Sequence, residues 1–258
     1  MIRVAVCGAC GRTGKLVVRQ VAMQKDMKLV AAITLPRDPD EGKDAGEIAG
    51  VSKLGVEVTG SDKIVEVLSR SKPDVLLDFT TAEAAVKNVK AASEAGISVV
   101  VGTTGFTSMQ SAEMEEAIKK GKIRAVISPN FSVGVNVFFR VNQETARLLG
   151  KDYEPSIVEV HHIHKKDAPS GTALKIAQII AGELGMKGEK INIKSIREGE
   201  VVGDHTVKFS NPYEEIEIIH RAKSRETFAA GAIKAARYVV TKGEPGVVKD
   251  MQDVLGLK

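Results

Sequence analysis

The sequence predicts an α/β fold, with an N-terminal parallel sheet and a second α+β domain built on a mixed or antiparallel sheet. Strand-like and helix-like segments alternate through about the first 130 residues, which is typical of βαβ units. After that point, several strand-like segments follow one another with short polar turns, which favours a mixed or antiparallel sheet. The chain has 258 residues, of which 43% are hydrophobic and 27% charged, so it has ample material for packed cores.

Hydrophobic patterning and segment length define the elements of the first part. Short runs rich in β-branched residues are expected to form parallel strands at residues 2–6, 29–33, 75–79, 97–101 and 124–127. Stretches with helical spacing lie between them at residues 15–23, 64–69, 82–95 and 111–119. The expected result is a doubly wound sheet.

The pattern changes after Asn130. Helices are expected over residues 131–149 and 173–184, and strands over residues 157–164, 191–197, 201–210 and 214–221. Residues 227–240 are again helical in pattern. The predicted organisation is therefore a first domain over residues 1–130, a second over residues 131–224, and a C-terminal segment, 225–258, that returns to the first domain.

Composition excludes several function classes. The net charge is only +4 with both signs interspersed, and the chain is 4% aromatic without Trp, so nucleic-acid binding is not expected. No apolar run is long enough to span a membrane, and the N-terminus lacks a signal-peptide pattern. Cys7 and Cys10 lie too close together to brace a fold. These features predict a cytoplasmic protein with reduced thiols and no membrane partner.

A glycine-rich loop, Gly8-Ala9-Cys10-Gly11-Arg12-Thr13-Gly14, joins the first expected strand to the first expected helix. Glycines allow the backbone to approach a pyrophosphate at the helix N-terminus, where N–H groups and the helix dipole favour anions. The spacing departs from the commoner G-x-G-x-x-G. The loop predicts a Rossmann-type dinucleotide-binding domain; the alternative is a turn with spare glycines, with Arg12 a solvated charge. The C-x-x-C spacing of Cys7 and Cys10 is better explained by the need for small side chains than by redox chemistry.

The end of the second expected strand bears on the choice of nicotinamide cofactor. A site selective for NAD usually offers Asp or Glu to the ribose about 20 residues beyond the glycines. Thr34 stands there, followed by Leu35, Pro36 and Arg37. With no carboxylate to repel a 2′-phosphate and Arg37 to attract one, we expect NADPH to be accepted, without excluding NADH. The alternative is that Arg37 is a surface charge.

Two further loops follow apolar strands, where open α/β sheets bind their ligands. They are Asp78-Phe79-Thr80-Thr81 and Gly102-Thr103-Thr104-Gly105. Glycine and threonine offer backbone approach and hydroxyl groups without bulk. Either loop alone could be a plain helix N-cap, but two at the same edge favour a cofactor cleft.

A histidine- and lysine-rich segment runs from Glu159 to Ala173. His161 is a candidate proton donor because imidazole titrates near neutral pH, and Lys165 supplies positive charge nearby. If the segment begins as a strand, His162 and His164 share one face. Ser170-Gly171-Thr172 then starts a helix whose free N–H groups would hold a carboxylate. The alternatives are a metal site at His162, His164 and Asp167, which the adjacent lysines oppose, and an exposed polar turn.

At this point the chain resembles the 4-hydroxy-tetrahydrodipicolinate reductase (dihydrodipicolinate reductase) family over nearly its whole length. The residues that carry the resemblance are the glycine loop, Gly102-Thr-Thr-Gly-Phe, Pro129-Asn-Phe-Ser-Val-Gly-Val-Asn, the segment from His161 to Thr172, Val202-Gly-Asp-His-Thr and Ser224-Arg-Glu-Thr-Phe-Ala-Ala-Gly-Ala. The histidine–lysine segment is far more specific to this family than the glycine loop.

The resemblance implies a cytoplasmic homotetramer of the diaminopimelate route of lysine biosynthesis, with a dinucleotide-binding domain and a substrate-binding and oligomerisation domain. It implies NAD(P)H-dependent reduction of a small cyclic dicarboxylate to tetrahydrodipicolinate, with loss of water. His161 would donate the proton with Lys165 as its catalytic partner, and His162, Gly171 and Thr172 would bind the substrate carboxylates. Cofactor contacts would come from Gly8, Ala9, Cys10, Gly11, Arg12, Thr13, Thr34, Arg37, Gly102, Thr103, Thr104, Ser128, Pro129, Asn130 and Phe131. No metal is implied. Relatives often carry an acidic residue and then Arg where Thr34 and Leu35 stand, which leaves the NADPH or NADH preference open.

Three other functions compete with this one. They are a reductase of another small dicarboxylate, a nicotinamide-nucleotide-binding sensor without turnover, and a metal hydrolase. The set formed by His161, His162, Lys165, Gly171 and Thr172 argues against a sensor, which has no need of a proton donor.

Overall fold

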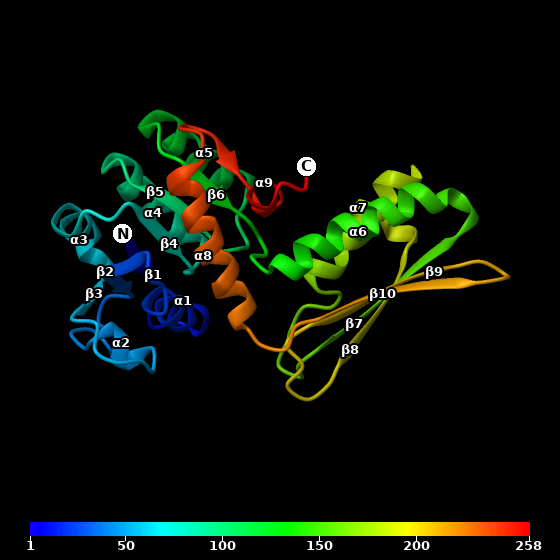
Figure 1. Cartoon of the computed structure of the whole chain (residues 1–258), viewed down its shortest axis with the longest axis horizontal. Helices are drawn as coiled ribbons and strands as arrows, with labels where there is room; N and C mark the ends of the chain where they lie inside the picture. Colours follow the sequence, from blue (N-terminus) through cyan, green and yellow to red (C-terminus); the bar gives the residue numbers. More distant parts are fainter. The chain divides into compact units, whose positions relative to one another are not determined.

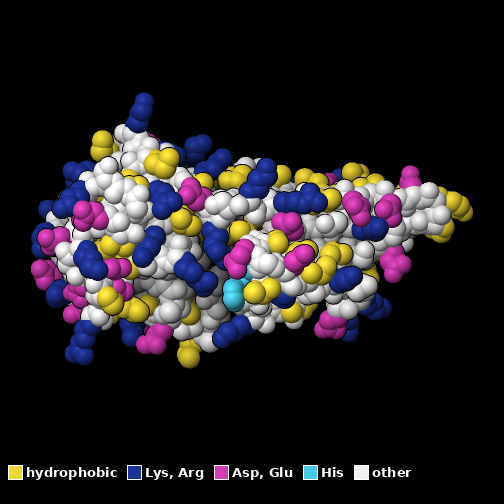
Figure 2. Space-filling model, turned by 90° about the horizontal axis from the view of Figure 1, so that it is seen from below, with side chains coloured by type: hydrophobic (Ala, Val, Ile, Leu, Met, Phe, Trp, Pro, Cys, Tyr) yellow, Lys and Arg dark blue, Asp and Glu magenta, His cyan; other side chains and the backbone are white.

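The structure, a computed structural model, describes residues 1–258 and divides into two compact units (Figure 1). The first unit comprises Met1–Ser132 and Glu226–Lys258, and the second comprises Val133–Arg225. The predicted fold class is confirmed, with a parallel sheet in the first unit and a mixed sheet in the second. No helix is long and apolar enough to cross a membrane. Both signs of charge are interspersed on the face drawn in Figure 2.

The first unit is built on a seven-stranded sheet in the order β11-β6-β5-β4-β1-β2-β3. All its pairings are parallel. The strands are β1 (Ile2–Cys7), β2 (Met27–Thr34), β3 (Val58–Gly60), β4 (Val75–Asp78), β5 (Ser98–Val101), β6 (Ala125–Ile127) and β11 (Val248–Lys249). The helices are α1 (Arg12–Ala22), α2 (Ala45–Ile48), α3 (Ile64–Ser71), α4 (Ala82–Glu94), α5 (Ser108–Gly121), α8 (Glu226–Thr241) and α9 (Met251–Leu255).

The central strands are buried on both faces, which explains why they are continuous apolar runs rather than alternating ones. Residues of α4 and α5 pack with the side chains on one face of the sheet. On α8, small residues allow the helix to lie close to the chain beneath it. A Cβ at Gly231 would lie 1.7 Å from the carbonyl oxygen of Phe131, so only glycine fits there.

The order of the strands reverses beside β1, whose neighbours are β2 on one side and β4 on the other. At such a switch point, the loops after the strands diverge and leave a crevice at the carboxyl edge of the sheet. The glycine loop after β1 and the loops after β4, β5 and β6 all lie at this edge, because the strands are parallel. The topology therefore gathers segments that are distant in sequence.

The second unit has a four-stranded sheet in the order β10-β9-β7-β8. Its elements are α6 (Val133–Leu149), β7 (Glu154–His161), α7 (Gly171–Leu184), β8 (Asn192–Arg197), β9 (Asp204–Ser210) and β10 (Glu215–Arg221). β7 and β8 are parallel, and the other pairs are antiparallel. Both helices contribute to a single core on one face of the sheet, with Phe138, Ile157, Ile180 and Phe209 among its buried residues (Figure 1).

Some sequence predictions of local structure were wrong. The strand expected over residues 157–164 ends at His161, because the next residues form a turn in which the Lys165 N–H donates to the His162 carbonyl. His162 and His164 therefore do not share a strand face. β9 begins at Asp204 rather than at residue 201, and the short elements α2, β3, β11 and α9 were not predicted. Segments this short carry too little periodic pattern to be recognised.

Candidate active site

The glycine loop has the geometry of a phosphate-binding turn. Gly8 has a φ of +77°, and a Cβ there would lie 2.4 Å from the carbonyl oxygen of Phe79. A Cβ at Gly14 would lie 1.9 Å from the carbonyl oxygen of Gly8. Both positions therefore require glycine, since a larger residue would push the loop away from α1 and from the loop after β4.

The N-terminus of α1 is open to an anion. Gly11 caps the helix with extended backbone, no side chain accepts from its first N–H groups, and its first turn holds no acidic residue. Arg12 is exposed, and Ala9 is buried beneath the loop. Free N–H groups and the helix dipole suit a pyrophosphate, so the residues present fit a nicotinamide dinucleotide.

Cys7 at the end of β1 and Cys10 in the glycine loop carry free thiols that are not bonded to each other. Cys7 is fully buried, and burial raises its pKa well above the usual value. Burial also raises the pKa of Cys10. Both side chains are therefore neutral thiols, in accord with their interpretation as small loop residues.

Asp78, at the end of β4, is fully buried and accepts hydrogen bonds from neutral donors. It accepts from Asn88 Nδ2 at 2.7 Å, from Thr103 Oγ1 at 2.7 Å and from Thr80 Oγ1 at 2.8 Å. Burial raises the pKa of Asp78, although these hydrogen bonds act in the opposite direction. The network fastens the loop after β4 to the loop after β5.

Thr103 is committed to that network. Its hydroxyl donates to Asp78 and accepts from the Thr80 N–H at 2.8 Å. Its neighbour Gly102 packs against the Phe79 ring. A Cβ at Gly102 would lie 2.1 Å from that ring, so a larger residue would not fit there. Thr104 is exposed. Of the predicted cofactor contacts in this loop, the backbone and Thr104 are available to a ligand, while the Thr103 side chain holds the loop in place.

The segment after β6 is ordered by its own polar groups. Ser128 is buried and donates through Oγ to the Asn130 carbonyl at 3.0 Å, while Asn130 Oδ1 accepts from the Ser132 N–H at 2.9 Å. Pro129 is exposed, whereas Phe131 is buried with its ring 5.8 Å from that of Phe79. The predicted cofactor residues after β1, β4, β5 and β6 thus lie at one edge of the sheet.

A carboxylate does reach the end of β2, contrary to the sequence-based argument for NADPH. Thr34 Oγ1 donates to Asp38 Oδ2 at 2.9 Å, and the Asp40 N–H donates to Asp38 Oδ1 at 2.9 Å. A turn closed by the Asp38 N–H on the Leu35 carbonyl brings the carboxylate back to the strand end. Arg37 is exposed, with a φ of 63°. The sequence argument did not include this carboxylate, because it considered only the residues directly after the strand; the acceptance of NADPH stays a prediction.

His161 ends β7 as a buried side chain. Its Nδ1 is hydrogen-bonded to Glu159 Oε2, and its ring lies 5.2 Å from that of His205 on β9. Burial lowers the pKa of His161, which the Glu159 carboxylate opposes and the charges of Lys165 and Arg197 assist. Burial also lowers the pKa of His205, to about 3, so His205 is a neutral packing partner.

Lys165 lies in the turn after β7 and pairs with Asp167 at 2.8 Å between Nζ and Oδ1. His162 has an Nδ1 without a hydrogen-bond partner, and burial followed by the charge of Arg225 lowers its pKa. His164 is exposed. Asp167 is therefore bound to a cation rather than to the two histidines, which disfavours the metal-site alternative.

The N-terminus of α7 completes this cluster. Ser170 is its N-cap and accepts from the Ala173 N–H at 3.2 Å. Gly171 is exposed, and a Cβ there would meet nothing within 4 Å. The first turn of α7 has no acidic residue. The structure therefore places His161 and Lys165 near the N-terminus of α7, where exposed Gly171 and the helix dipole suit a carboxylate.

Sequence reasoning missed three residues of this cluster: Glu159, Arg197 and His205. Glu159 is two residues before His161, so it shares a strand face with it, and this spacing was a usable signal. Arg197 and His205 became neighbours only through strand pairing, in which Arg197 lies opposite His161 and His205 opposite Glu159. No local pattern reveals that register.

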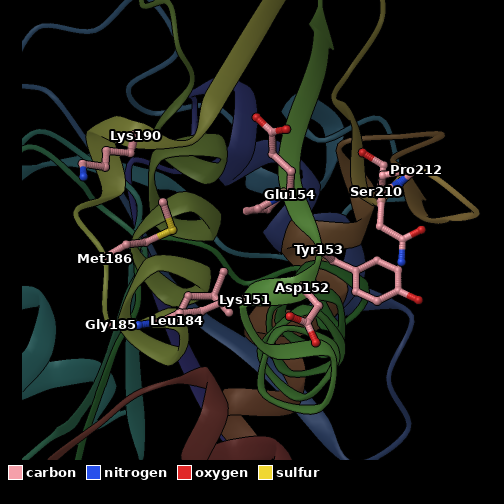
Figure 3. Close-up of a pocket in the computed structure, with 12 residues that line it drawn as sticks. Lys151, Asp152, Tyr153, Glu154, Leu184, Gly185, Met186, Lys190, Ser210 and Pro212 are labelled. Atoms are coloured by element: carbon pink, nitrogen blue, oxygen red, sulfur yellow. The ribbon is translucent and has the colours of Figure 1, made fainter.

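Two other candidate places are distinct from this cluster. A cavity of about 790 Å³ is lined by Tyr153, Glu154, Met186 and Ser210, among others (Figure 3). It lies at the start of β7, about 23 Å along the strand from His161 at roughly 3.3 Å per residue, and no predicted site residue lines it. Cys10, Asp38 and Asp40 have potential metal-ligand atoms within 4.8 Å of one another, but Lys15 and Lys43 pair with Asp40.

A Rossmann-type sheet with a phosphate-binding loop, and a second unit that holds a histidine–lysine cluster, define a class: the nicotinamide-dependent oxidoreductases of two domains. Models of the family match both halves of the chain, "Dihydrodipicolinate reductase, N-terminus" over residues 2–131 and "Dihydrodipicolinate reductase, C-terminus" over residues 134–255. The chain belongs to the dihydrodipicolinate reductase family.

Comparison with individual proteins gives the same family. The chain is 48% identical to the 4-hydroxy-tetrahydrodipicolinate reductase of Methanocaldococcus jannaschii, with 100% of this chain and 98% of the relative covered. It is 46% identical to that of Methanothermobacter thermautotrophicus, with both chains fully covered. Among solved structures, a dipicolinate-bound dihydrodipicolinate reductase from Paenisporosarcina sp. TG-14 has a TM-score of 0.79 at 26% identity, with 98% of each chain covered.

The Asp78 network predicts that Thr103 acts on stability. Replacing Thr103 by Val leaves the buried Asp78 without one donor and the Thr80 N–H without its acceptor, so the free energy of unfolding should fall by about 1–3 kcal/mol. Urea unfolding without nucleotide measures this. Thr104→Val is the matched control and should change stability by less than about 0.5 kcal/mol because Thr104 is exposed. Equal effects of the two substitutions would contradict the assignment.

Proposed function

We propose that the protein is an NAD(P)H-dependent 4-hydroxy-tetrahydrodipicolinate reductase. The observation that carries the proposal is the cluster at the end of β7, where His161, Lys165 and the N-terminus of α7 occur within a family matched over the whole chain. The reaction consumes the hydroxylated cyclic dicarboxylate, NAD(P)H and a proton, and it yields tetrahydrodipicolinate, NAD(P)⁺ and water. The charge and proton requirements of this reaction match the cluster.

Each residue of the cluster has a separate task in this proposal. The N–H groups at Gly171 and Thr172, together with a ring N–H of His162, hold the substrate carboxylates, as N–H donors do for anions. Lys165 stabilises the negative charge that develops when the ring is reduced. His161, when protonated, gives a proton to the ring from Nε2, since its Nδ1 is occupied by Glu159.

The bound nicotinamide dinucleotide supplies the hydride. The chain holds it through the N–H groups of the glycine loop and of α1, and through the loops after β4, β5 and β6. The buried Asp78 network joins two of those loops, so a dinucleotide would bind to backbone groups whose positions are already fixed.

The assay for this function follows nicotinamide absorbance, with substrate generated in place from pyruvate and aspartate semialdehyde by the preceding enzyme. Rapid substrate-dependent oxidation is expected. His161→Gln should lower kcat by about 10²–10⁴, the contribution typical of a positioned acid, with cofactor affinity unchanged. Lys165→Ala should lower kcat and raise KM.

His164→Gln is the matched control, because this neighbouring imidazole is 70% exposed and contacts only Glu200 among charged groups at 3.7 Å. Its turnover should remain at the wild-type level. Full activity of His161→Gln would remove the proton-donor role. Tight nucleotide binding by wild-type protein without any oxidation would instead favour a sensor or a reductase of a different dicarboxylate.

We propose further that NADH is used at least as well as NADPH. Asp38 provides a carboxylate at the end of β2, where Rossmann-type domains bind the adenosine ribose, and a carboxylate there accepts from the ribose hydroxyls and repels a 2′-phosphate. Asp40 lies beside it, although Lys43 pairs with Asp40 at 2.8 Å. Arg37 is exposed and would pair with a 2′-phosphate, so we expect NADPH to be accepted as well.

Paired substitutions separate these two influences. Asp38→Asn should raise kcat/KM for NADPH relative to NADH, by about tenfold for each 1.4 kcal/mol of repulsion removed. Arg37→Ala should lower kcat/KM for NADPH and leave that for NADH unchanged. If Asp38→Asn leaves the NADPH-to-NADH ratio of kcat/KM at the wild-type value, Asp38 does not face the ribose.

We also propose a homotetramer assembled through the outer face of the four-stranded sheet. α6 and α7 lie on the other face, so Val158, Val160, Ile196 and Ile219 have no helix over them. Ile219 is 43% exposed. Apolar side chains on a sheet face without a covering helix are typical of an interface between subunits.

Light scattering after gel filtration tests the assembly. The expected mass is four times the 27.6 kDa of one chain. Val158→Glu should reduce it, because a charge would be buried against a partner. Ile163→Glu, at a side chain 59% exposed in the turn after β7, should leave the mass unchanged. A wild-type protein that runs as a monomer would exclude the proposal.

A further inference from the structure

We propose that Glu159 is a positioning residue for the reaction: it holds the His161 ring so that Nδ1 carries a hydrogen toward the carboxylate and Nε2 is the atom that takes up and delivers the proton. The inference rests on the proposed reductase function and adds a residue that the family motif beginning at His161 does not include. It is carried by the geometry of one fully buried carboxylate.

Glu159 has no exposed surface, and both of its oxygens are occupied. Oε2 is hydrogen-bonded to His161 Nδ1, while Oε1 accepts from Arg197 Nη1 at 2.9 Å and from the Ser170 N–H at 3.3 Å. Burial would raise the pKa of Glu159, but hydrogen bonds from neighbouring side chains, including His161 and Arg197, outweigh it and lower the pKa. The group is therefore a carboxylate, which accepts hydrogen bonds and cannot donate one.

This carboxylate determines the tautomer of His161. A neutral imidazole has one N–H and one acceptor nitrogen, and the nitrogen facing a carboxylate must carry the hydrogen. The hydrogen therefore sits on Nδ1 and leaves Nε2 as the basic atom. When Nε2 is protonated, the Glu159 charge stabilises the imidazolium, as an orienting carboxylate does for a catalytic histidine.

Gly203 lies beside the His161 ring. A Cβ at Gly203 would lie 3.0 Å from His161 Nε2, tighter than most Cβ contacts, so glycine at this position leaves room at the reacting nitrogen. His205 packs edge-on against the ring at a centroid distance of 5.2 Å. Burial lowers the pKa of His205 to about 3, so the His205 ring packs against His161 as a neutral group and adds no positive charge there.

Glu159 also links the proton donor to the carboxylate-binding end of α7. The Ser170 N–H that donates to Glu159 belongs to the N-cap residue of that helix. Ser170 Oγ lies 3.4 Å from His205 Nε2 as well. One buried carboxylate therefore fixes His161 relative to the helix that begins at Gly171, so a substrate carboxylate held there meets Nε2 in a constant geometry.

The charges around His161 determine how its titration should respond. Glu159 on β7 raises its pKa, and Lys165 in the following turn and Arg197 on β8 lower it. Asp167 pairs with Lys165, and His205 on β9 is neutral. Glu159→Gln removes the carboxylate charge that raises the pKa of His161, so this pKa should fall further. Because His161 must be protonated to donate, the limb of kcat/KM that falls with rising pH should move to lower pH.

The test uses the nitrogen-15 NMR shifts of the histidine ring in the full-length protein. Wild-type protein should show the Nδ1–H tautomer at His161, assigned by comparison with His161→Gln. Glu159→Gln places an amide donor or a weaker acceptor at Nδ1, so the Nδ1–H tautomer should no longer dominate. Its kcat should fall at least ~10-fold and by no more than the ~10²–10⁴ of the proton donor itself, with the pH limb displaced downward.

Glu200→Gln is the matched control, since its side chain is 78% exposed beside His164. It should leave the tautomer of His161 and the pH profile unchanged. A wild-type spectrum with the hydrogen on Nε2 would overturn the proposal without any variant, even if Glu159→Gln failed to fold. An unshifted pH limb in folded Glu159→Gln would overturn it as well. The tautomer is measured without substrate, so a failure of the reductase assay would remain distinguishable from a failure of this inference.

Discussion

Burying a carboxyl group at the carboxyl end of a strand is costly, and both units are organised around one such group. Asp78 ends β4 in the first unit, and Glu159 lies two residues from the end of β7 in the second. Neither side chain has exposed surface. A buried carboxyl group without hydrogen-bond partners destabilises the fold by several kcal/mol. Each of these groups is therefore hydrogen-bonded to donors from other segments, and those hydrogen bonds fix the surrounding loops.

The two groups meet this cost in different ways. Asp78 is surrounded by an amide and two hydroxyls, all neutral, and burial raises its pKa. Glu159 is held by the Arg197 guanidinium and an imidazole, and its pKa is lowered. The hydrogen bonds around Asp78 involve no cationic partner, and they join the loop after β4 to the loop after β5. The partners of Glu159 maintain a negative charge beside a histidine, an arrangement that is common where a proton is moved.

The sequence predicted what local patterns determine. Alternating strands and helices predicted the parallel sheet, and the glycine loop was recognisable because its function depends on residues adjacent in the chain. His161 and Lys165 were predicted as site residues for the same reason. Arg197 was not, because it reaches Glu159 across 38 positions through the pairing of β7 with β8. Asp38 was missed because a turn returns it to Thr34, and the expected strand to His164 failed because a turn begins at His162.

The Glu159–Arg197 pair is difficult to explain as a stabilising device. Replacing a buried ion pair with well-packed apolar residues is often neutral or stabilising, because desolvation offsets the attraction between the charges. Apolar side chains at the two positions would have filled this end of the sheet, as Ile157 and Val207 do nearby. Instead the charge of Glu159 is kept, compensated by Arg197, and directed at His161 Nδ1. Packing alone does not require a carboxylate at position 159. A carboxylate in this orientation is expected if the His161 ring must present Nε2 to a substrate.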